Sequence, residues 1–117
     1  MELVAFLGSD KETWGQVTGL INHGEWGKIF LIKNKDASTY NVSVKTELIT
    51  IDSSQPTLEL KKELMEKLRN KLGEMEVALS IASGNGKEHM ALISALLSLP
   101  TGIRLVIFTK TGVEYIN

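Results

Sequence analysis

The segment VALSIASGNGKEHMALISALLSL, residues 77–99, decides the fold. Its first six residues are mostly apolar and predict a strand over residues 77–82, because a continuous apolar run is typical of a strand buried on both faces. The glycine-rich stretch 83–86 predicts a tight connection, and residues 87–99 predict a helix that Pro100 breaks. A strand, a short connection and a helix form the repeating unit of a parallel α/β sheet.

The same alternation of strand and helix continues on both sides of this segment. Residues 33–43 are polar and predict a loop, while Val42 and Val44 either extend a strand or form a separate edge strand. Helical spacing predicts helices over residues 9–23 and 54–72, and apolar runs predict strands over residues 3–7, 29–32, 48–51, 103–108 and 113–116. We therefore expect one domain over residues 1–117. Its expected fold class is α/β, a three-layer Rossmann-like sandwich with a mainly parallel sheet and a C-terminal antiparallel hairpin strand.

Local signals indicate where the first two helices begin, end and pack. Ser9 and Glu12 have the spacing of a capping box, which predicts that the first helix begins at Ser9. Gly15 and Gly19 lie inside that helix, where they lower its stability and permit close backbone packing. The apolar stripe of the second helix runs to Leu72, which predicts a helix end there.

The composition is typical of a small globular domain and excludes several functional classes. The chain has 117 residues, with 13 Lys+Arg against 14 Asp+Glu, and this near-neutral charge argues against binding to duplex DNA. The chain has no cysteine and its two histidines lack a zinc-site spacing, so we expect no metal and no cofactor. No apolar run approaches the roughly 18 residues of a membrane span, and the first residues do not resemble a signal peptide. We expect a cytoplasmic protein that does not contact a membrane.

Two loops at the carboxyl ends of predicted strands form the candidate binding site. In open parallel sheets, ligands bind where such loops lead into helices. Glycines let the backbone approach a ligand closely, and a helix amino terminus offers unpaired N–H groups to an anion. A lysine in the second loop adds positive charge. The candidate ligand-binding residues are Gly8, Ser9 and Asp10 in the first loop and Ser83, Gly84, Asn85, Gly86 and Lys87 in the second.

A second interpretation of these loops involves no ligand. The glycines then only form the turn, and Asn85 caps the following helix together with Glu88. The second loop lacks the P-loop pattern, and His89 stands where the third glycine of a dinucleotide fingerprint would fall. Ser9 is similarly interpreted as a helix N-cap rather than a nucleophile, because no histidine lies near it in the sequence.

The tryptophans and histidines are interpreted mainly as structural residues. Trp14 and Trp26 are expected to pack in the interior, with stacking on a nucleotide base as the alternative. His23 lies at the expected end of the first helix and is expected to stabilise that end. His89 lies in the first turn after the glycine loop, where we expect a surface role or, alternatively, a ligand contact.

The helix predicted over residues 87–99 is apolar on nearly every side from Met90 to Leu99. A helix at the protein surface normally has a polar stripe opposite its core face, and this one lacks it. We therefore expect a homodimer through this helix, because identical patches associate about a two-fold axis. The alternative is that the terminal hairpin covers the helix.

With these elements in order, the chain resembles the CRISPR-associated Rossmann-fold (CARF) domains over nearly its whole length. The resemblance rests on the first strand, which ends in Gly8-Ser9-Asp10, and chiefly on residues 77–97. There the family has a Thr-Gly-Gly-Thr-Lys-like loop before a small-and-apolar helix, and this chain has Ser83-Gly84-Asn85-Gly86-Lys87. A serine thus replaces the usual threonine, and an asparagine replaces the second glycine.

The resemblance implies a nucleotide-binding protein of antiviral defence. Such a homodimer binds a cyclic oligoadenylate second messenger, and the two copies of each loop surround one ring-shaped ligand. Some family members are ring nucleases, which cleave the ligand without a metal by attack of a ribose 2′-hydroxyl on the neighbouring phosphodiester. Ser9 and Lys87 match the hydroxyl and the cation that those enzymes use as catalytic residues. Three hypotheses follow: a binding protein, a ring nuclease, and a Rossmann-like interaction subunit without a small-molecule ligand.

Overall fold

The first strand, β1 (Glu2–Leu7), is buried along its whole length. Its side chains alternate between two hydrophobic clusters: Val4 and Phe6 pack into one, and Leu3 and Leu7 pack into the other. Successive side chains of a strand point to opposite faces, so the continuous apolar run over residues 3–7 needs cover on both sides. The prediction of a strand buried on both faces is confirmed.

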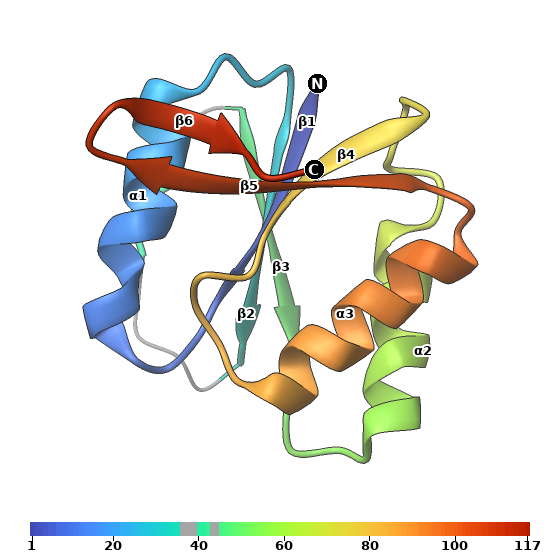
Figure 1. Cartoon of the computed structure of the whole chain (residues 1–117). Helices are drawn as coiled ribbons and strands as arrows, with labels where there is room; N and C mark the ends of the chain where they lie inside the picture. Colours follow the sequence, from blue (N-terminus) through green and yellow to red (C-terminus); the bar gives the residue numbers. More distant parts are fainter. Residues whose placement is uncertain (36–39, 43–44) are drawn as a thin grey trace.

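Figure 1 shows the computed structural model, which describes residues 1–35, 40–42 and 45–117. The elements in chain order are β1, the 3-10 turn η1 (Lys11–Thr13), α1 (Trp14–His23), β2 (Ile29–Asn34), β3 (Thr46–Ile51), α2 (Thr57–Leu68), β4 (Glu76–Ser80), α3 (Gly86–Ser98), β5 (Gly102–Thr109) and β6 (Gly112–Tyr115). The strands form one sheet in the order β3-β2-β1-β4-β5-β6. Neighbouring strands are parallel except β5 and β6, which form the predicted antiparallel hairpin.

The helices lie on both faces of the sheet, with α1 on one face and α2 and α3 on the other (Figure 1). Val17 and Leu20 of α1 join the cluster that contains Leu3 and the other β1 residues of that face. Leu64 of α2 and Leu92 of α3 join the opposite cluster. The three-layer, Rossmann-like α/β sandwich predicted from the sequence is therefore confirmed. Among the described residues, no helix is both long and apolar enough to cross a membrane.

The hairpin of β5 and β6 packs against α1. A Cβ atom placed on Gly19 would lie 2.3 Å from Cδ2 of Phe108, so the helix approaches β5 closely only because Gly19 has no side chain. The ring of His23 lies 4.9 Å from that of Phe108, centroid to centroid, and its Nδ1 lies 3.0 Å from the Gly19 carbonyl oxygen. The prediction that Gly19 permits close packing is confirmed, and His23 acts at the helix end as expected.

The hairpin packs on α1 through Phe108 and Val113, and it leaves the outer face of α3 uncovered. Met90 and Leu97 of α3 are 67% and 64% exposed. The alternative in which the terminal hairpin covers this helix is therefore wrong. The apolar face of α3 is open to solvent in the single chain.

The predicted ends of the first two helices are wrong. Asp10, not Ser9, caps the first helical turn: its Oδ1 accepts a hydrogen bond from the backbone N–H two residues later, at 3.1 Å. An aspartate side chain readily folds back onto the chain in this way. The helix α2 ends at Leu68, because Asn70 adopts a left-handed conformation with φ of 68°. Leu72 then packs against the core from the loop that follows.

Several strand boundaries also differ from the prediction. β2 runs to Asn34, one of the residues assigned to the loop, and β3 begins at Thr46 rather than at residue 48. Val42 is exposed and lies in no strand, whereas Val44 lies outside the described residues. β4 ends at Ser80 because its pairing with the sheet stops there, two residues before the predicted end.

Replacement of the two glycines of α1 should have opposite effects. Gly19→Ala places a methyl group against Phe108, so we expect a loss of about 2 kcal/mol from the free energy of unfolding, as in other overpacked cores. Gly15→Ala is the matched control, because nothing lies within 4 Å of its Cβ position. It should stabilise the protein by up to about 1 kcal/mol through helix propensity. Urea unfolding of both variants measures this, and equal effects of the two changes would contradict the packing argument.

Candidate functional site

The two candidate loops meet at the centre of the carboxyl edge of the sheet. β1 and β4 are adjacent and parallel, yet β1 leads to α1 on one face and β4 leads to α3 on the other. Loops that diverge in this way leave a crevice between them, which is where open α/β sheets bind ligands. A Cβ atom on Gly8 would lie 2.5 Å from the backbone nitrogen of Gly84, so the loops touch backbone to backbone.

A buried hydroxyl joins these loops. Ser83 is fully buried, and its Oγ accepts a hydrogen bond from the backbone N–H of Gly8 at 2.7 Å. The hydroxyl of Thr13 lies 2.6 Å from the same Oγ and also donates to the Asp10 carbonyl oxygen at 2.7 Å. The Ser83 side chain therefore connects the loop after β1, the start of α1 and the loop after β4. This role inside the protein takes its hydroxyl away from the surface of the crevice.

Trp14 fixes the other side of the first loop. Its indole N–H donates to the Gly8 carbonyl oxygen at 2.8 Å, so both backbone polar groups of Gly8 are hydrogen-bonded. The ring packs edge-on against Tyr40 at 5.6 Å, and the ammonium of Lys11 lies 5.9 Å from the ring centre. Trp26, in contrast, is buried in the core, as predicted, and its indole donates to the Leu20 carbonyl oxygen. Trp14 is thus the tryptophan beside the candidate site.

The start of α3 has a complete capping box, as the second interpretation predicts. The Asn85 side chain accepts a hydrogen bond from the Glu88 backbone N–H at 2.9 Å, and the Glu88 carboxylate accepts one from the Asn85 backbone N–H at 2.9 Å. His89 adds a contact to the Ser83 carbonyl oxygen through Nε2, at 2.7 Å, which requires a proton on that nitrogen. The backbone N–H groups of Gly86 and Lys87 lie in the first turn, where a helix offers no internal acceptor.

A small crevice lies between the loops. It has a volume of about 110 Å³ and is lined by Ser9, Asp10, Gly84, Asn85 and Glu88. A water molecule occupies roughly 30 Å³ of the liquid, so the crevice holds a few atoms of a ligand and is too small for a whole nucleotide. Two of the lining residues carry carboxylates, which accept hydrogen bonds and repel anions.

The structure separates the candidate residues into groups. Ser9, Asp10, Gly84 and Asn85 line the crevice, whereas Gly8 and Ser83 are buried beneath it. Gly86 lies at one end of a groove along α3. Lys87 is half-buried, and its ammonium donates to the Ser53 carbonyl oxygen, in the turn between β3 and α2, at 2.9 Å.

Glu88 and Ser53 are the residues that sequence reasoning did not place at the site. Glu88 was considered only as a capping residue, yet its carboxylate also lines the crevice and accepts a hydrogen bond from the Ser53 hydroxyl at 2.7 Å. The position of Glu88 three residues after Asn85 was a usable signal for the cap. Nothing in the sequence links it to Ser53, which lies 35 positions away.

Two carboxylates hold the turn between β3 and α2 in place. Hydrogen bonds from the Ser54 hydroxyl and backbone N–H, with a further one from Lys35, lower the pKa of Asp52 below its ordinary value. Burial raises the pKa of Glu63, but hydrogen bonds from Lys67, the Asp52 backbone N–H and Gln55 outweigh it and lower that pKa. Both carboxylates are therefore ionised at neutral pH and act as acceptors for the turn.

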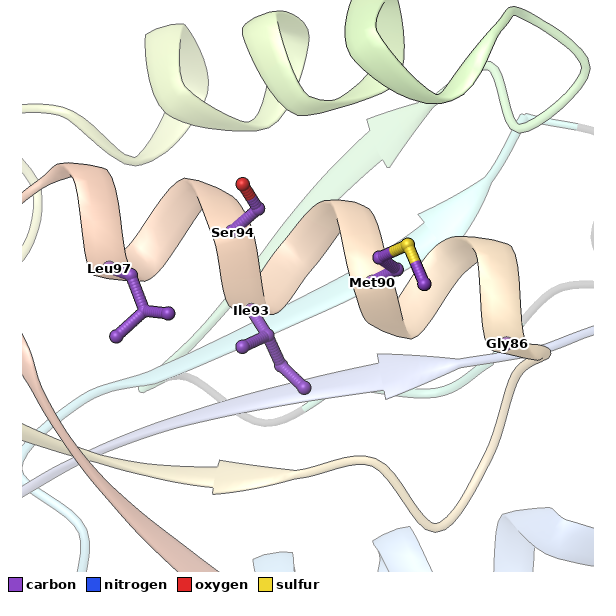
Figure 2. Close-up of a pocket in the computed structure, with 5 residues that line it drawn as sticks. All are labelled: Gly86, Met90, Ile93, Ser94 and Leu97. Atoms are coloured by element: carbon purple, nitrogen blue, oxygen red, sulfur yellow. The ribbon is translucent and has the colours of Figure 1, made fainter.

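The groove along α3 begins at the glycine loop. It has a volume of about 410 Å³ and is lined by Gly86, Met90, Ile93, Ser94 and Leu97. The last four have the i, i+3, i+4, i+7 spacing of one helix face. Figure 2 shows that the side chains of Ile93 and Leu97 point away from α2. This apolar surface is therefore continuous with the loop that carries the candidate binding residues.

Neither the family models nor the curated proteins provide a relative of this chain. No family model matches it, and no curated protein matches it in sequence. In the described part of the chain, no group of three or more His, Cys, Asp or Glu residues is arranged to hold a metal ion.

Two glycines of the second loop should respond differently to alanine. Gly84 has φ of +103°, and its Cβ position lies 2.9 Å from Cδ1 of Phe6, so we expect Gly84→Ala to cost about 2 kcal/mol of unfolding free energy. Gly86 lacks both constraints, since nothing lies within 4 Å of its Cβ position. Gly86→Ala should change stability by less than about 0.5 kcal/mol or increase it slightly. Urea unfolding tests this, and comparable losses in both variants would show that loop strain is not specific to Gly84.

Proposed function

We propose that this protein binds a cyclic oligoadenylate second messenger as a homodimer in CRISPR-linked antiviral defence. The observation that carries the proposal is the contact between the loops after β1 and β4, which places Gly8 and Gly84 against each other at the switch point of the sheet. This is the position where Rossmann-like folds bind nucleotides. The resemblance of residues 83–87 to the CARF loop supports the choice of ligand class. The proposal also places the protein in the cytoplasm, where nucleotide second messengers are made.

The residues around the crevice have complementary chemistry for a ribonucleotide. The first-turn N–H groups of Gly86 and Lys87, with the Lys87 ammonium, suit the oxygens of a phosphodiester. The carboxylates of Asp10 and Glu88 accept hydrogen bonds and suit ribose hydroxyl groups or an adenine amino group. The ligand-binding set in this proposal is Gly8, Ser9, Asp10, Ser83, Gly84, Asn85, Gly86 and Lys87, in which Gly8 and Ser83 act by shaping the loops.

The size of the crevice supports a site shared between two chains. A volume of about 110 Å³ cannot enclose a cyclic oligonucleotide, so one chain supplies only part of the contacts. The apolar groove of α3 begins at Gly86, and a second copy packed there about a two-fold axis would bring a second pair of loops near the first. The predicted dimer segment from Met90 to Leu99, which is most of α3 and its C-cap, and the ligand loops thus belong to one proposed assembly.

Binding is measured by titration calorimetry with cyclic tetra-adenylate and cyclic hexa-adenylate. We expect saturation near one ligand per two chains for one of the two rings. Lys87→Ala should weaken that affinity about tenfold, because a charge-assisted hydrogen bond contributes roughly 1.5–3 kcal/mol. Lys62→Ala is the control, because Lys62 is exposed on α2. An absence of heat with both rings would favour the interaction subunit instead.

Analysis of the ligand after incubation separates binding from cleavage. Ser9 lines the crevice whereas Lys87 is held at the Ser53 carbonyl, so the two residues that match ring-nuclease catalysts do not line one cavity. We therefore favour binding without turnover. Incubation of the ligand with the protein and excess chelator should leave it cyclic. Linear products that end in a 2′,3′-cyclic phosphate would instead establish the metal-independent ring nuclease.

The dimer is tested by a charge on the exposed face of α3. Leu97→Glu should shift the protein from dimer to monomer in sedimentation at micromolar concentration, because it places a carboxylate in an apolar interface. Leu58→Glu is the matched control, since Leu58 is 70% exposed on α2, away from the groove. A wild-type protein that sediments as a monomer of about 13 kDa, near the chain mass of 12.9 kDa, would refute the dimer.

A further inference from the structure

We infer that Ser53 is a positioning residue for Lys87, so that the turn between β3 and α2 forms a third wall of the candidate site. The part of the inference that concerns a ligand rests on the proposed function. The part that concerns Lys87 itself rests on contacts in the chain and is tested without a ligand. Neither the sequence motif nor the two glycine loops includes this turn.

Ser53 is hydrogen-bonded through every polar group that it has. Its backbone N–H donates to Oδ1 of Asn34, at the end of β2, at 2.9 Å. Its hydroxyl donates to Oε2 of Glu88 at 2.7 Å, and its carbonyl oxygen accepts from Nζ of Lys87 at 2.9 Å. One residue therefore connects the end of β2 to two consecutive residues in the first turn of α3.

The partners of Ser53 are themselves held in place. Glu88 is 6% exposed, and its carboxylate also accepts a hydrogen bond from the Asn85 backbone N–H. The carboxylate is therefore a fixed acceptor for the Ser53 hydroxyl. On the other side, the backbone N–H of Asp52 donates to Glu63 of α2 at 3.2 Å. The Ser53 carbonyl oxygen therefore has a defined position, and it accepts from the long side chain of Lys87.

A lysine side chain loses considerable rotamer freedom when its ammonium is fixed. The hydrogen bond to the Ser53 carbonyl removes this rotamer freedom before any ligand binds. A phosphate that contacts Lys87 therefore does not have to restrict the lysine side chain further. The position of the Lys87 ammonium also indicates how a ligand would extend. Lys87 is not one of the residues that line the small crevice, so a ligand that reaches both must extend from the crevice to the turn.

The first test follows the reactivity of the Lys87 amine and needs no ligand. The purified protein is treated with acetyl N-hydroxysuccinimide, and the acylation of Lys87 is measured by mass spectrometry relative to the exposed Lys62. Ser53→Ala removes the bond to Glu88 and should raise the relative rate about threefold to tenfold. Ser54→Ala is the matched control, because the Ser54 hydroxyl donates to Asp52 and does not contact α3. Ser53→Thr keeps a hydroxyl and should restore the slow rate.

An unchanged Lys87 rate in Ser53→Ala, or an equal rise in Ser54→Ala, would overturn the inference whatever the protein binds. Thermal unfolding of all three variants is recorded as well, because a general loosening of the fold would raise the reactivity of other buried lysines too. The inference requires that Lys87 changes while the half-buried Lys67 does not.

The second test uses the cyclic oligoadenylate ring that the wild-type protein binds. Ser53→Ala should weaken the affinity about tenfold, Ser53→Thr should restore it to within threefold, and Ser54→Ala should leave it unchanged. Unchanged or tighter binding by Ser53→Ala, with Lys87 more reactive, would overturn the role of Ser53 in ligand binding. If the wild-type protein binds neither ring, the proposed function fails, and the acylation rates alone decide whether Ser53 positions Lys87.

Discussion

The contact between Gly8 and Gly84 is the constraint on which the rest of the site depends. β1 and β4 pair at the centre of the sheet, and their chains leave it toward opposite faces, so the two loops touch where they leave the sheet and then diverge. A Cβ atom on Gly8 would lie 2.5 Å from a backbone nitrogen of the other loop, which leaves no room for any side chain. The hydrogen bond from Gly8 to the buried Ser83 hydroxyl fixes this approach. The position of Asn85, and with it the start of α3, follows from that fixed loop.

The capping box and the ligand hypothesis are compatible. The side chains of Asn85 and Glu88 accept hydrogen bonds from two backbone N–H groups at the start of α3. The capping box does not use the N–H groups of Gly86 and Lys87 in the first turn. A helix whose cap occupied every donor would have nothing to offer a phosphate. The cap also brings the Glu88 carboxylate to the crevice, where it would repel a simple anion and would accept a hydrogen bond from a hydroxyl group of the proposed ligand.

The sequence predicts the layers of this protein better than its site contacts. The continuous apolar run of β1 requires cover on both faces, and that pattern is local and unambiguous. Helix ends depend on competition between neighbours: the Asp10 carboxylate, and not the Ser9 hydroxyl, accepts the hydrogen bond from the Glu12 backbone N–H. The contact between Lys87 and Ser53 joins residues that lie 34 positions apart in the sequence, on either side of α2 and β4. No periodicity encodes such a pair, so only the assembled sheet reveals it.

The near-neutral charge of the chain has a specific consequence at this edge of the sheet. With a net charge of -1, long-range attraction does not concentrate anions at the surface, so recognition depends on short-range geometry. Within the described residues around the crevice, Lys87 supplies a positive charge and Asp10 and Glu88 supply negative ones. An anion that carries no hydrogen-bond donor is attracted by Lys87 and repelled by the two carboxylates. A ribonucleotide satisfies both, because its phosphate and its 2′-hydroxyl lie close together. The arrangement of charges therefore supports the proposed ligand, which carries both groups within one nucleotide.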